Sequence, residues 1–120
     1  MKYLLMIYGN QEKWTSIPAE EWPAEIARTE AFIKRYVQTG EMLGAYGLGD
    51  AAAARLVRQT ADGPAVTDGP YLETKEYLAT FYLVEVESEE RAHQIAADMP
   101  WARKEPVEVW PILNESMGEG

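Results

Sequence analysis

The fold is decided by the run Leu78-Ala79-Thr80-Phe81-Tyr82-Leu83-Val84-Glu85-Val86, which carries the strongest strand signal in the chain. Aromatic and β-branched residues of this kind favour extended structure. Ser88 follows and is a good helix cap, and the two glutamates behind it suit the positive end of a helix dipole. The apolar face of this second helix consists of Ala92, Ile95, Ala96 and Met99. Pro100 is expected to end the helix.

The segment before this strand predicts a hairpin. Residues 54–58 and 64–67 are extended in pattern, and they flank the turn signal Asp62-Gly63-Pro64. Residues 50–54 are interpreted as a connector. Residues 42–48 are expected to be extended, with glycines that favour bulges or close backbone approach.

The N-terminal part predicts a strand and a long helix. Residues 3–8 have apolar residues on both faces, which is typical of a buried strand, and residues 10–17 are expected to be a loop. A helix is predicted over residues 23–39, with Pro23 at its first position and Gly40 as a left-handed cap. Its expected apolar face repeats at three- and four-residue steps, through Ile26, Thr29, Ile33, Tyr36 and Val37.

The C-terminal part predicts a last strand over residues 107–113, where Pro111 indicates an edge position. The complete order is strand, helix, several strands, helix, strand. This order indicates an α+β fold of the ferredoxin-like β-α-β-β-α-β type, with an inserted β-hairpin and an antiparallel sheet. We expect one domain over residues 1–113 and a mobile tail over residues 114–120.

Two helices can cover only one face of such a sheet. We expect that the two helices cannot cover all of the apolar side chains of the sheet, which include Tyr3, Leu5, Tyr82 and Trp110. Packing of two sheets face to face would cover the remainder, so we predict a homodimer through the sheet faces.

Composition narrows the function classes. The chain has 120 residues, no cysteine and a formal charge of −9. The missing cysteines exclude disulfides and thiolate catalysis and fit a cytoplasmic location, and the acidic balance argues against nucleic-acid binding. No apolar run has the length of a membrane span. With a single histidine, His93, and no phosphate-binding glycine loop, we expect neither a metal site nor a bound cofactor.

The stretch Val66-Thr67-Asp68-Gly69-Pro70-Tyr71-Leu72-Glu73-Thr74-Lys75-Glu76 resembles the signature of the DGPF branch of the YCII-related family. Tyr71 stands for the usual Phe, and Ala79-Thr80 for a glycine pair in the strand behind. The resemblance extends to the opening strand, to Arg58 and to Val107-Glu108-Val109-Trp110-Pro111, and so covers nearly the whole chain.

The resemblance implies a dimeric α/β barrel without implying a reaction. Fold relatives include cofactor-free oxygenases, lactone isomerases and dehalogenating enzymes, which is an analogy of fold. Some family members are encoded with, or fused to, extracytoplasmic-function sigma factors. The YCII proteins proper are thought to use a His–Asp pair. This chain departs from that pattern, because His93 lies on the second predicted helix.

The candidate catalytic residues lie in the signature. Asp68 is either a turn residue that caps its own backbone or a carboxylate held at the mouth of a cleft. Glu73, Lys75 and Glu76 follow, and a carboxylate beside a lysine can act as a base while the lysine holds an anion. The competing interpretation is a solvated charged turn.

The candidate substrate-binding residues are mostly aromatic. Tyr8, Tyr46, Tyr71 and Tyr82, with Trp14, could line a pocket for a small aromatic or carbonyl compound, or could serve core and dimer packing. Arg58 is expected to pair with Asp68 or to bind an anion.

Two hypotheses follow. The first is a small cofactor-free enzyme of isomerase, lyase or dehalogenase type, with Asp68 as base and with Lys75 or Arg58 and tyrosine hydroxyls stabilising negative charge. The second is a non-catalytic ligand-binding or regulatory module that works beside a sigma factor.

Overall fold

The computed structural model describes residues 1–70 and 76–116. Its strands are β1 (Lys2–Gly9), β2 (Met42–Gly47), β3 (Arg55–Thr60), β4 (Gly63–Asp68), β5 (Tyr77–Glu85) and β6 (Glu108–Pro111). Its α-helices are α1 (Gln11–Thr15), α2 (Trp22–Gln38) and α3 (Glu89–Asp98). Short 3-10 turns are η1 (Ala19–Glu21), η2 (Ala51–Ala53) and η3 (Pro100–Arg103).

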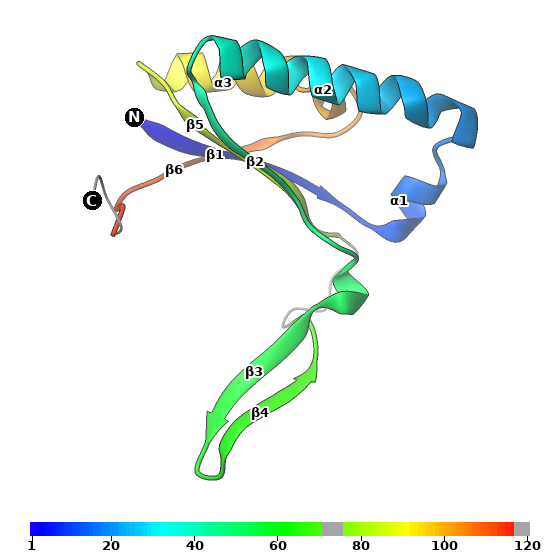
Figure 1. Cartoon of the computed structure of the whole chain (residues 1–120), viewed down its shortest axis with the longest axis vertical. Helices are drawn as coiled ribbons and strands as arrows, with labels where there is room; N and C mark the ends of the chain where they lie inside the picture. The colour runs from blue at the N-terminus through cyan, green and yellow to red at the C-terminus, as the bar shows by residue number, and fades with distance from the viewer. Residues whose placement is uncertain (71–75, 117–120) are drawn as a thin grey trace.

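The main sheet has four strands in the order β2-β5-β1-β6, and every pair in it is antiparallel. The strand at residues 77–85 is therefore internal, as the strong strand signal indicated. The edge position predicted from Pro111 is confirmed, because β6 borders only β1. α2 and α3 lie together on one face of the sheet (Figure 1), which confirms the ferredoxin-like α+β fold.

The hydrophobic core lies between that face and the two helices. Leu5 and Val84 of the sheet are fully buried against Tyr36 of α2 and Ile95 of α3. Both predicted caps are confirmed: the Ser88 hydroxyl accepts a hydrogen bond from the Arg91 amide at 3.1 Å, and Gly40 has a φ of 83°.

The expected division of the sheet's two faces was wrong for three residues. Tyr3, Leu5 and Tyr82 are each at most 4% exposed because the helices cover them. Leu5 lies opposite Tyr82 in the ladder, so both side chains share the helix-covered face. The other face, here called the open face, carries Leu4, Met6, Tyr46, Phe81, Leu83 and Trp110.

Two further expectations need correction. Residues 11–15 form α1 instead of a loop, because the Asn10 side chain accepts a hydrogen bond from the Lys13 amide at 2.8 Å and caps the helix. On α2, Phe32 is buried with Tyr36, whereas Ile26 and Val37 are more than half exposed. The buried face of α2 is therefore narrower than the repeat predicted, and it is centred on aromatic residues.

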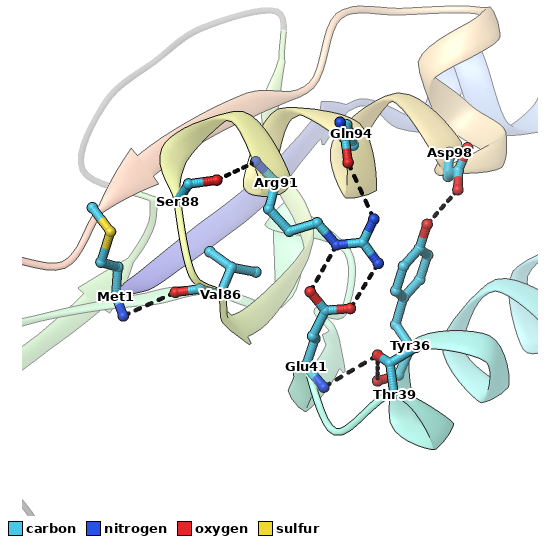
Figure 2. A network of polar contacts seen from close by, with 9 residues as sticks. All are labelled: Met1, Tyr36, Thr39, Glu41, Val86, Ser88, Arg91, Gln94 and Asp98. Atoms are coloured by element: carbon cyan, nitrogen blue, oxygen red, sulfur yellow. Dashed lines mark hydrogen bonds and ion pairs between the residues drawn. The ribbon is translucent and has the colours of Figure 1, made fainter.

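A polar network fastens α3 to the turn between α2 and β2 (Figure 2). The Arg91 guanidinium donates to both carboxylate oxygens of Glu41, at 2.8 and 2.9 Å. These hydrogen bonds are the main reason that the pKa of Glu41 lies below its usual range. The Tyr36 hydroxyl donates to Asp98 in the same region, so α2 and α3 are joined by polar contacts as well as by the core.

β3 and β4 form a separate two-stranded sheet that projects away from the helix layer (Figure 1). We call it the arm. It confirms the predicted hairpin: β3 begins one residue later than predicted, and the pairing, from Arg55 opposite Asp68 to Thr60 opposite Gly63, extends further toward the turn. Val57 and Val66 face each other on the arm and are more than 60% exposed.

Among the helices that the structure describes, none combines the length and the apolar character that a membrane span requires.

Candidate functional site

The base of the arm borders two adjoining hollows, of about 490 and 650 Å³. They share Leu48–Ala51, Pro70, Tyr77 and Leu78 as lining. We call the combined space the arm-base cavity. Its walls come from the ends of β1 and β2, the η2 turn and the segment where the signature Asp68-Gly69-Pro70 ends the arm, so distant parts of the sequence meet there.

Local backbone contacts explain why these segments converge. The Leu48 amide donates to the Ala79 carbonyl at 2.7 Å and continues the β2–β5 pairing. The Gly69 amide donates to the Ala54 carbonyl at 3.0 Å. A Cβ on Gly69 would lie 3.2 Å from the carbonyl carbon of Arg55, which is closer than most real contacts. The signature glycine therefore permits a close backbone approach beside the cavity.

Tyr8 lines the larger hollow. Burial and, secondly, the nearby Glu108 carboxylate raise the pKa of Tyr8 above its ordinary value of 10.0. The Tyr8 hydroxyl donates to the Met6 sulfur at 3.7 Å, a weak acceptor, and a hydrogen bond with the Glu108 carboxylate also contributes to the raised pKa of Tyr8. Glu108 is itself fixed by the Trp110 indole, which donates to it at 2.7 Å.

A charged cluster borders the same hollow. The carboxylate of Glu76, another lining residue, forms an ion pair with the Lys13 ammonium. Lys13 also contacts Glu105 at 2.7 Å, and hydrogen bonds to Glu105 and then Glu76 raise the pKa of Lys13. Sequence reasoning missed Lys13 and Glu105. Asn10 as a cap was the signal that could have placed Lys13 on a helix.

The structure separates the predicted site residues. Tyr8 borders the arm-base cavity, but Tyr46 lies on the open face, where its ring is 5.1 Å from that of Phe81. Tyr82 is buried on the helix side of the sheet. The predicted aromatic pocket therefore does not unite these tyrosines within one chain. Tyr71, Glu73 and Lys75 lie outside the described residues.

Asp68 ends β4 with a side chain that is 95% exposed. It does not line either hollow of the arm-base cavity. The expected ion pair between Arg58 and Asp68 was wrong, because the β3–β4 register places Arg58 opposite Ala65. Arg55 lies opposite Asp68 instead, and its Nε is 3.8 Å from the Asp68 carboxylate. Asp68 as a catalytic base stays a prediction.

In the described part of the chain, no three His, Asp or Glu side chains gather as a metal site would require. His93 lies on α3, 57% exposed, with Nε2 3.9 Å from Glu89. His93 therefore lies on the helix layer, away from the arm. The titratable groups at the cavity are the Glu76 carboxylate, the Lys13 ammonium that pairs with it, and the Tyr8 phenol.

The comparisons with known proteins agree with this fold. The chain resembles the structure of 5-chloro-2-hydroxyhydroquinone dehydrochlorinase (TftG) from Burkholderia phenoliruptrix AC1100, solved in complex with 2,5-dihydroxybenzoquinone. The TM-score is 0.50 at 12% identity, over 98% of each chain, so this likeness concerns the fold. This chain is also 33% identical in sequence to an uncharacterised protein, R00369, of Rhizobium meliloti (strain 1021). The match covers 99% of this chain and 98% of that protein. The YCII-related domain matches residues 1–116, and the chain therefore belongs to the YCII-related domain family.

Proposed function

We propose that this chain is a small-molecule enzyme of the isomerase, lyase or dehalogenase type that works without a cofactor. The observation that carries the proposal is that a protonated phenol, Tyr8, and a carboxylate, Glu76, line the same hollow. Removal of a proton from a carbon next to a carbonyl group requires a base for the proton and a hydrogen-bond donor for the carbonyl oxygen, and both groups must lie in the same cavity.

The chemistry follows from these groups. The Glu76 carboxylate takes a proton from a carbon next to a substrate carbonyl, and the electron pair moves onto the carbonyl oxygen. Tyr8 donates to the developing enolate, and Lys13 orients the Glu76 carboxylate. The electron pair then returns, either to accept the proton at another carbon or to expel a leaving group such as chloride. In the second case the proton stays on Glu76 until water removes it.

The signature supports the same location. Assignment to the DGPF branch is part of the proposal, and its Gly69-Pro70 step forms a wall of the cavity. Asp68 as the base and Lys75 as the anion-binding group, the assignments made from sequence, remain alternatives within this proposal. Glu76 is favoured because it lines the hollow.

The size of the cavity suggests the substrate class. Hollows of about 490 and 650 Å³ lie in the range of small-molecule sites. The dehydrochlorinase of similar fold was captured with a dihydroxyquinone. We therefore propose single-ring compounds that carry hydroxyl or keto groups as substrates.

We further propose that the chain is a homodimer through its open faces. Leu4 lies opposite both Leu83 and Trp110, so three apolar residues form one row across the sheet. Trp110 and Tyr46 are each about half exposed. Apolar surface of this kind on a sheet is a typical packing surface for a second sheet.

The test uses chlorinated and unchlorinated hydroxyhydroquinones, whose keto tautomers have a C–H bond next to a carbonyl group, with chloride release and proton exchange from D₂O as readouts. We expect Glu76→Gln to lower kcat/KM about a hundredfold or more, and Tyr8→Phe to lower it less. Glu90→Gln on α3 is the matched control. If Asp68→Asn abolishes turnover while Glu76→Gln does not, the base is Asp68. If no compound turns over or binds, the regulatory alternative gains weight, and co-elution with a sigma factor becomes the next test.

A further inference from the structure

The arm packs less against the rest of the chain than the main sheet does. Its two strands pair with each other along their length and have few contacts with other described elements. The arm is held at its base, where the Arg55 guanidinium donates to the Ala52 and Ala54 carbonyls at 3.1 and 2.9 Å. The radius of gyration is accordingly 16.8 Å, whereas a compact chain of this length would have about 14 Å.

The arm exposes an apolar pair. A sheet of only two strands is at best marginally stable in water unless an apolar face of it packs against something else. Val57 and Val66 lie opposite each other and are 66% and 61% exposed. Side chains that are opposite in a ladder project from the same face, so the two valines form one apolar surface. Because they are exposed, they are available to another molecule.

The direction of the arm indicates which molecule this is. α2 and α3 cover one face of the main sheet, and the arm projects away from them, to the side toward which the open face is turned (Figure 1). A second sheet that packed on the open face would therefore lie alongside the arm. Since the two copies of such a pair are related by a two-fold axis, the arm of each copy would reach the other.

The charge of the arm is compatible with a second copy. The whole chain carries a formal charge of −9, so two copies repel each other through their acidic surfaces. The arm adds nothing to this charge, because its two cations, Arg55 and Arg58, balance its two anions, Asp62 and Asp68. An acidic copy can thus approach the arm without the repulsion that the rest of the chain exerts.

We propose that the arm clasps a second copy of this chain. Each arm extends along the side of the partner copy and packs Val57 and Val66 against the partner's sheet. The inference rests on the homodimer through the open faces proposed above, and it adds a second contact that can be removed separately. Ala54 and Gly69, which flank the arm, also line the arm-base cavity. The clasp therefore connects the dimer contact to the wall of the proposed site.

Replacement of both valines measures the clasp. Val57→Thr combined with Val66→Thr keeps the β-branched shape that strands favour and removes the apolar character. Both changes act twice in a symmetric dimer, so we expect the dissociation constant of the dimer to rise about tenfold or more in sedimentation equilibrium. Val37→Thr, at an exposed residue of α2, is the matched control and should leave the constant unchanged.

The possible failures are distinguishable. A wild-type dimer whose dissociation constant is the same in the double variant overturns the clasp and leaves the open-face homodimer in place. A wild-type chain that is monomeric at every concentration overturns both.

A spin label tests the clasp without altering either valine. The chain has no cysteine, so Gln59→Cys, on the same face of the arm as the valines, provides a single attachment point. Spin-labelled chain is mixed with ¹⁵N-labelled wild type, and only the wild-type copy is observed by NMR. We expect broadened amide signals in its main sheet, including Leu4 and Leu83, and a sharp signal for Arg28 on α2. No broadening in a mixed dimer, or broadening confined to α2 and α3, overturns the proposal.

Discussion

The Lys13 ammonium forms an ion pair with the Glu76 carboxylate and so joins α1 to the end of the signature segment. Lys13 also reaches Glu105, before β6, at 2.7 Å. One side chain thus connects three segments beside the arm-base cavity. The proposed base depends on this contact for its position.

Replacement of Lys13 tests that dependence. We expect Lys13→Met to lower kcat/KM about tenfold or more, because Glu76 loses the contact that orients it. Lys13→Arg keeps the charge and should retain most of the activity. Lys34→Met, on the exposed side of α2, is the control. Steady-state kinetics on any active compound of the panel provides the measurement, and full activity in Lys13→Met would contradict the assigned role.

Tyr8 should titrate abnormally. Its pKa is raised above 10.0 by burial and by Glu108. Glu108→Gln removes the carboxylate contribution, so the pKa of Tyr8 should fall part of the way back, while the effect of burial remains. Phenolate absorbance during an alkaline titration measures this, with Tyr8→Phe identifying the signal. A Tyr8 that titrates identically in both backgrounds would show that Glu108 is not its neighbour in solution.

The Glu41–Arg91 pair should make stability depend on pH in the acid range. The pKa of Glu41 is lowered in the folded state from an ordinary value of 4.5. The unfolded chain therefore binds the proton first as pH falls, and the stabilisation, fully present above the ordinary value, is lost as pH falls through the folded pKa.

Glu41→Gln should consequently reduce the slope of unfolding free energy against pH below about pH 5. Urea unfolding at a series of pH values measures the slope. Glu85→Gln, at the sheet end, is a control for the loss of one exposed carboxylate. Parallel pH profiles for wild type and Glu41→Gln would contradict this account of the pair.

The open face should determine oligomeric state. Trp110→Glu introduces a charge into its apolar row and should convert a dimer into a monomer of 13.5 kDa. Val37→Glu, which changes an equally exposed residue on α2, should leave the mass unchanged. Light scattering after gel filtration distinguishes the two results. A wild-type chain that is monomeric at every concentration would exclude the proposed interface.

A side chain at Gly69 should destabilise the fold. Gly69→Ala places a Cβ 3.2 Å from the Arg55 carbonyl carbon, and we expect a loss of about 1–3 kcal/mol in unfolding free energy. Gly47→Ala is the matched control, because nothing lies within 4 Å of a Cβ there. Chemical denaturation of both variants measures the difference, and equal stability would remove the packing reason for the signature glycine.

The sequence predicted those parts of the fold whose signals are local. β5 and α3 followed from a strand-forming run and the Ser88 cap, and the arm followed from the turn at residues 62–64. The faces of the sheet were harder, since Tyr3 and Trp110 are both aromatic and only the register of β1 against its neighbours separates them.

The candidate site was predicted less completely because it is assembled from distant segments. The signature indicated the place, and Gly69 and Pro70 do border the cavity. Lys13 could not be connected to Glu76 from sequence, because that contact depends on how α1 packs at the end of β1. Asp68 was favoured for its position in the motif, yet exposure is a tertiary property that the motif does not encode.

The arm-base cavity as a small-molecule site is tested most directly by backbone NMR shift mapping of the full chain with hydroxylated single-ring compounds. We predict saturable shifts concentrated at Gly9, Gly49, Asp50 and Ala79, which line the cavity, and weaker binding by Tyr8→Phe. Shifts confined to the open face, or no saturable shift with any compound, would contradict it.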